Sequence, residues 1–100
     1  MKSARGNGQH SALELEILKE MAEALGRAGE RLARAIHDYR ALEAAASDAA
    51  ADHARRLAEQ RRHVLQAREW LVIQREAIGL RTHDVLDAHY PLPFQSPAEL

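Results

Sequence analysis

The chain has 100 residues, of which 46% are hydrophobic and 4% aromatic, and 14 basic and 15 acidic side chains give it a formal net charge of −1. One domain of this length has a thin core, so we expect oligomerisation to add burial. The absence of Cys excludes disulfides, thiol catalysis and iron–sulfur ligation. The balanced charge, the lack of a signal peptide and the lack of an apolar run near ~20 residues predict a cytoplasmic protein without a nucleic-acid or membrane partner.

Residues 1–10 are polar and predict a disordered tail. Ser11 and Glu14 then have the spacing of a capping box, which marks the start of a helix. From there to about residue 45, apolar or small side chains recur at alternating steps of three and four, which predicts one long helix of about 50 Å. These positions are Leu18, Met21, Leu25, Ala28, Leu32, Ala35, Tyr39, Leu42 and Ala46.

Two glycines interrupt this helix, at Gly26 and Gly29. Each costs about 1 kcal/mol relative to Ala in a helix interior. Gly29 lies on the apolar stripe, so we interpret it as a point of tight crossing by a neighbouring helix. A hinge or a notch for a ligand is the alternative.

The alanine-rich stretch 44–54 is compatible with one continuous helix, which would give a rod, but the charges favour a turn near residues 45–48. Ser47 is the best cap there, and Asp48 suits the first turn of a new helix. Three Glu and three Arg residues, each set spaced by seven, face one another if the chain folds back about position 45.5. The predicted ion pairs are Glu16–Arg75, Glu23–Arg68 and Glu30–Arg61.

A second helix is predicted over about residues 48–79, with apolar residues seven apart at Leu57, Val64, Leu71 and Ile78. The segment 68–81 contains the only Trp, Trp70, within an apolar run that goes right round a helix. We therefore expect this segment to be an assembly surface. Replacing Trp70 by Ala is expected to cost about 3–5 kcal/mol of stability.

Gly79 is expected to end the second helix as a C′ glycine. Thr82 can cap a short third helix from His83 to about His89. Two prolines require residues 90–94 to be extended, and we expect Leu92 and Phe94 to cover apolar surface near Trp70. Ser96 has the signature of another helix start.

Metal sites find little support in this sequence, because no two of the six His residues are three or four apart. The third helix does gather His83, Asp84, Asp87 and His89, which are weak candidates for a divalent ion, but a polar first turn explains them equally well. We predict no cofactor.

The segment 36–41 is similar to the His box of histidine-kinase dimerisation domains. That resemblance implies His37 as a phosphoryl acceptor and Asp38 as its orienter and base. The Thr-Pro of that family is replaced here by Ala41 and Leu42, and no ATP-binding domain is present. With no phosphate loop or catalytic triad either, we predict that the protein is not an enzyme.

Three blocks in the order 12–20, 24–29 (ALGRAG) and 74–81 (QREAIGLR) resemble a group of small bacterial proteins of unknown function. The resemblance covers about residues 12–95. It implies a small all-helical protein and supplies no catalytic residue.

Together these patterns predict an all-α protein, with a helical hairpin and short third helix over 11–90 and an extended tail over 91–100. Two hairpins would pack into a four-helix bundle. The predicted function is a homodimeric structural or adaptor module without catalysis, which could also bind an unidentified protein; the alternative is a phosphotransfer or small-ligand bundle that uses His37. The predicted packing residues are Leu18, Leu25, Gly29, Leu32, Tyr39, Leu57, Val64, Trp70, Leu71 and Ile78.

Overall fold

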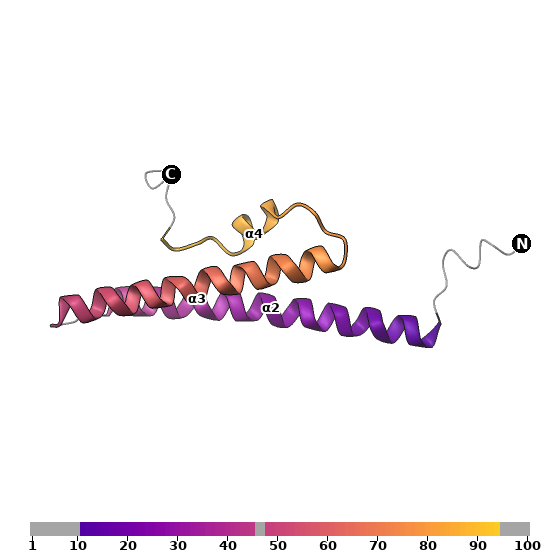
Figure 1. Ribbon diagram of the computed structural model, residues 1–100, viewed down its shortest axis with the longest axis horizontal. Coiled ribbons are helices and arrows are strands. Elements are labelled where there is room, and N and C mark those ends of the chain that lie inside the picture. Colours follow the sequence, from indigo (N-terminus) through magenta and orange to yellow (C-terminus); the bar gives the residue numbers. More distant parts are fainter. Residues whose placement is uncertain (1–10, 46–47, 95–100) are drawn as a thin grey trace, which may run out of the picture.

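Two long antiparallel helices form the body of the protein, and a short third helix lies beside them (Figure 1). The computed structural model describes residues 11–45 and 48–94. Helix α2 spans Ala12–Ala44, α3 spans Ala50–Ala77 and α4 spans Asp84–His89. The described residues form no strand. The predicted all-α hairpin with a short third helix is confirmed.

The capping box at the start of α2 is confirmed. The Ser11 hydroxyl accepts a hydrogen bond from the Glu14 backbone N–H at 3.1 Å, and the Glu14 carboxylate accepts one from the Ser11 N–H at 2.8 Å. Two backbone donors that the helix leaves unpaired at its N-terminus are satisfied in this way.

The predicted break between the long helices is also confirmed. Helix α2 ends at Ala44, its C-cap Ala45 has an extended backbone with a φ of −75° and a ψ of 135°, and α3 begins at Ala50. Ser47, the predicted cap, lies outside the described residues, as do the predicted N-terminal tail, the last part of the C-terminal tail and the helix start at Ser96.

The end of α3 is a Schellman motif. Gly79 has a φ of +95°, its N–H donates to the carbonyl of Glu76, and the N–H of Leu80 donates to the carbonyl of Arg75. This backbone conformation favours glycine, since a Cβ in the left-handed region meets the backbone. The predicted role of Gly79 is confirmed.

Helix α4 begins one residue after the predicted start, and Thr82 is not its cap. The N-cap position is His83, whose side chain makes no capping hydrogen bond to the helix, while the Thr82 carbonyl accepts from Arg75 Nη2 at 2.8 Å. Residues beyond α4 turn back along the hairpin, in the direction of its closed end (Figure 1).

The core draws on all of these segments. Its members are Ala28, Leu32, Ile36 and Tyr39 of α2, Val64, Ala67 and Leu71 of α3, Leu86 of α4, and Phe94. The small side chains of Ala28 and Ala67, both almost fully buried, allow close packing between the long helices. The Phe94 ring meets the Tyr39 ring edge-on, with 5.2 Å between centroids. The C-terminal segment is therefore part of the core.

Leu92 and Phe94 lie over the hairpin as predicted, with Phe94 in the core and Leu92 packed against it. Trp70 itself is not buried. Its side chain is 44% exposed, whereas its neighbour Leu71 is 3% exposed. A step of one residue turns the side chain by about 100° around a helix, which carries Trp70 off the face that Leu71 shares with the core. None of the described helices is both long and apolar enough to cross a membrane.

Candidate functional site

The three arginines of the predicted ladder contact the C-terminal segment instead of the glutamates of α2. Arg68 Nη2 pairs with Asp87 Oδ1 at 3.1 Å, and Arg75 Nε donates to His83 Nδ1 at 3.1 Å. The guanidinium of Arg61 lies 4.4 Å from the centroid of the Phe94 ring. No ion pair joins these arginines to Glu16, Glu23 or Glu30 within the described residues.

The register of the hairpin explains why the ladder is wrong. The Gln60 side chain donates to the Ala35 carbonyl at 3.2 Å, and the midpoint of 35 and 60 is 47.5, two positions later than the 45.5 that the ladder requires. Each helix therefore meets its partner about four residues out of the predicted register, which is more than one turn. In addition, α4 and Phe94 occupy the face of α3 on which these arginines lie.

His83 joins the end of α3 to the start of α4. Its Nδ1 accepts from Arg75 Nε, which always carries a proton, so Nε2 bears the hydrogen in the neutral ring and donates to Glu76 Oε2 at 3.2 Å. The imidazole is only 17% exposed. This network fixes the α3–α4 connection.

The candidate metal ligands on α4 are not brought together into a site. Asp87 is paired with Arg68, and His83 with Arg75 and Glu76. In residues 11–45 and 48–94, no group of three or more His, Asp or Glu side chains has the geometry to hold an ion.

Gly29 permits the approach of Tyr90, not of a crossing helix. A Cβ on Gly29 would lie 2.6 Å from Tyr90 Oη. The expected close approach is thus present, but its partner is the residue that follows α4. A hollow of about 380 Å³ lies beside this contact, between α2, α3 and α4.

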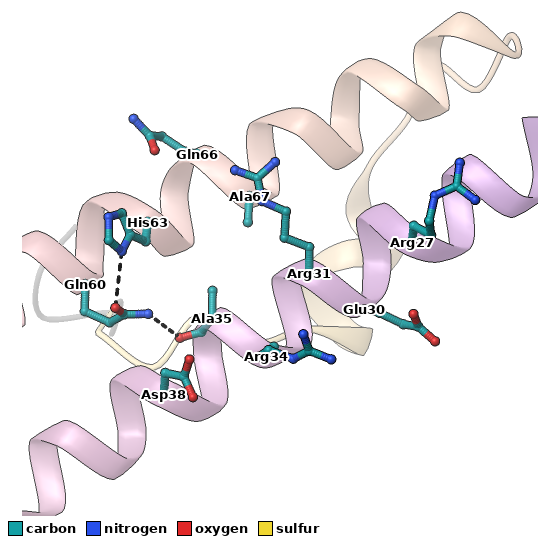
Figure 2. A pocket seen from close by; sticks show the side chains of 10 residues that line it. All are labelled: Arg27, Glu30, Arg31, Arg34, Ala35, Asp38, Gln60, His63, Gln66 and Ala67. Carbon is teal, nitrogen blue, oxygen red and sulfur yellow. Dashed lines mark hydrogen bonds between the residues drawn. The ribbon is translucent and has the colours of Figure 1, made fainter.

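The opposite face of the hairpin carries a polar hollow of about 430 Å³ between α2 and α3, which we call the arginine groove (Figure 2). Its cationic side chains come from one stripe of α2, at Arg27, Arg31 and Arg34, where spacings of four and three place them on one face. Figure 2 shows Arg31 reaching toward α3 beside Ala67. The remaining lining residues are Glu30, Ala35, Asp38, Gln60, His63 and Gln66.

A smaller hollow of about 190 Å³, the Trp70 hollow, adjoins the arginine groove and shares Arg27 and Arg31 with it. Ala24, Ala28, Trp70 and Gln74 complete its lining. Neither hollow was predicted from the sequence. The spacing of Arg27, Arg31 and Arg34 was the available signal, but only the structure places Trp70 beside them.

Helix α2 extends past the end of α3, and we call this part of the hairpin the open end (Figure 1). The first turns of α2, which form it, carry exposed apolar side chains. Leu13 is 66% exposed. Leu15, Ile17 and Leu18, also on the first turns of α2, are the other large apolar side chains exposed there. Ile78 and Leu80, which follow α3, are exposed as well.

The predicted packing residues divide between core and surface. Gly29, Leu32, Tyr39, Val64 and Leu71 are buried, and Leu25 and Leu57 are partly buried against the core. Leu18, Trp70 and Ile78 are exposed.

His37 is exposed on α2, and Asp38 beside it lines the arginine groove. The hypothesis that His37 accepts a phosphoryl group stays a prediction.

Comparison with known proteins gives a family but no activity. No curated protein and no solved structure matches the chain. A family model described as a family of unknown function (DUF6665) matches residues 1–97. The chain therefore belongs to this family of unknown function.

Proposed function

We propose that the protein is a homodimeric interaction module, without catalysis of its own, whose two copies meet at the open end. The observation that carries the proposal is the set of four large, exposed apolar side chains on the first turns of α2, at Leu13, Leu15, Ile17 and Leu18. Exposed apolar surface of this kind is typical of protein interaction sites.

The unequal lengths of the long helices support this assignment. Helix α2 has 33 residues and α3 has 28, and every residue from 11 to 20 is exposed. A helical segment of this length gains little stability without packing. A second copy related by a two-fold axis would lay its own overhang against this one, with the same surface used on both copies.

The faces of the hairpin favour contact at the end over contact along the whole length. Phe94 and Leu86 cover the central core on one face. The arginine groove gives the other face a charged surface. The proposed dimer therefore differs from the predicted four-helix bundle, because the two hairpins overlap only at their open ends.

The first test is the mass of the protein in solution. We expect a dimer at micromolar concentration, and a monomer when Leu13 and Ile17 are both replaced by Glu, because the charges would be desolvated in the overlap. Leu65→Glu is the matched control, since Leu65 is exposed on α3 away from the open end. Circular dichroism must show that all variants keep their helices. A wild-type chain that is monomeric at micromolar concentration would contradict the proposal.

The second test uses the absence of native Cys. In an antiparallel overlap, residues near the two-fold axis approach their own copies, so Ile17→Cys should form a disulfide between two chains under mild oxidation. Leu65→Cys should form far less. Equal yields from the two variants would place the contact elsewhere.

A further inference from the structure

We propose that the arginine groove and the Trp70 hollow together bind a nucleoside di- or triphosphate, with the base against Trp70 and the phosphates along Arg27, Arg31 and Arg34. This site is separate from the proposed dimer contact at the open end. Its assignment rests on three features of the described residues: guanidinium groups without an ion pair, an accessible indole, and the size of the hollows.

The guanidinium groups of the groove form no ion pair with a carboxylate of residues 11–45 or 48–94, although Glu30 and Asp38 also line the groove. No ion pair within 4.0 Å joins Arg27, Arg31 or Arg34 to an acidic side chain of the described residues. Glu30 extends away from α3 in Figure 2. The groove is lined by three arginines against two carboxylates, Glu30 and Asp38, so a bound anion would meet a net positive surface. Guanidinium forks match phosphate oxygens in pairs of hydrogen bonds.

Trp70 supplies the surface for a base. Its side chain is 44% exposed, and it lines a hollow that shares Arg27 and Arg31 with the groove. An indole face accepts any base by stacking. Gln74 lies in the same hollow, where its amide has both donors and an acceptor for a base edge.

The dimensions fit a small ligand. The hollows of about 430 and 190 Å³ fall within the range of small-molecule sites when joined. Arg27 and Arg34 are seven residues apart, about 10 Å along the helix, which allows a chain of phosphates to run from Trp70 toward His63. The net charge of −1 and the pI near 6.6 argue against a long nucleic acid as the occupant.

Trp70 is the only Trp, so its fluorescence reports directly on the site. The Trp70 emission, excited at the red edge of indole absorption, should be quenched saturably as ATP is added. Adenosine lacks the phosphates that would form charge-assisted hydrogen bonds, and inorganic tripolyphosphate lacks the base that would stack on Trp70. Each should therefore bind at least about tenfold more weakly than ATP. A saturable ATP signal that tripolyphosphate matches in affinity would overturn the role of Trp70, and no saturable signal at millimolar ATP would overturn the site.

Variants separate this site from general anion binding. Arg31→Ala should weaken ATP binding about tenfold or more, and Trp70→Leu, followed by calorimetry, should weaken it about fivefold or more. Arg62→Ala is the control, since Arg62 is an exposed arginine of α3 outside both hollows. Equal losses in Arg31→Ala and Arg62→Ala would contradict the proposal, as would an oligonucleotide that binds while ATP does not.

Discussion

Tyr90 places its hydroxyl where a side chain on residue 29 would stand, so that a Cβ added to Gly29 would lie only 2.6 Å from Tyr90 Oη. Gly29 is buried in the middle of α2, where glycine costs about 1 kcal/mol relative to alanine. The close approach accounts for this cost: it lets the residue after α4 pack directly on the backbone of α2.

Gly29→Ala is therefore expected to destabilise the protein despite the better helix propensity of alanine. Tyr90 or α2 must move to relieve the steric overlap, which should cost about 1–3 kcal/mol of stability. This cost outweighs the gain of about 1 kcal/mol from the higher helix propensity of alanine. Chemical denaturation followed by circular dichroism measures the difference.

Two further variants are the controls for this prediction. Gly26 has nothing within 4 Å of an added Cβ, so Gly26→Ala should stabilise the helix by up to about 1 kcal/mol. Tyr90→Phe should rescue much of the loss in Gly29→Ala, because the next Tyr90 atom lies at an ordinary 3.5 Å. If the stability changes of Gly29→Ala and Tyr90→Phe simply add in the double variant, the Tyr90 hydroxyl is not the obstacle.

Trp70→Ala should cost about 1 kcal/mol or less, not the 3–5 kcal/mol expected from the sequence. The indole is 44% exposed, so less of it is withdrawn from water than in a core position. Leu32→Ala, at a site with no exposure, should cost about 2–5 kcal/mol under the same conditions. Equal losses in the two variants would show that Trp70 is buried in solution.

Phe94→Ala should lower the free energy of unfolding by about 3 kcal/mol, because it empties the space against Tyr39. Phe94→Leu should cost less, since it retains apolar volume and loses mainly the aromatic pair and the contact with Arg61. If Phe94→Ala has no measurable effect, the segment after α4 does not pack against the hairpin.

Gly79→Ala should cost about 1–2 kcal/mol, because the φ of +95° disfavours a residue with a Cβ. Gly79→Asn should cost less, since Asn tolerates left-handed backbone better than most residues. Thermal unfolding of the two variants gives the comparison. An Ala variant as stable as the wild type would mean that the end of α3 can adopt another conformation.

The start of α2 and the end of α3 were predictable because local chemistry sets them. The Ser11–Glu14 capping box and Gly79 act through hydrogen bonds within a few residues. The spacing of apolar side chains similarly identified Leu32 and Val64 as core positions.

The register and the partners of the arginines were not predictable, because distant segments decide them. Because alanines lie on both sides of the turn, the sequence does not determine its position to within several residues. A register shift of four residues moves each residue by a full turn along the partner helix. Arg68 had suitable acidic residues at both Glu23 and Asp87, and sequence spacing cannot rank an α4 partner against an α2 partner. For the same reason, the proximity of Trp70 to Arg27 and Arg31 emerges only from the fold.

The position of Phe94 in the core has a consequence for synthesis of the chain. A ribosome releases the two long helices before the segment that covers one face of them, so the nascent hairpin exposes Tyr39 and its neighbours until Phe94 has left the exit tunnel. The final stage of folding must therefore follow translation of nearly all of these 100 residues. Until then the uncovered face is available to chaperones and to other nascent copies.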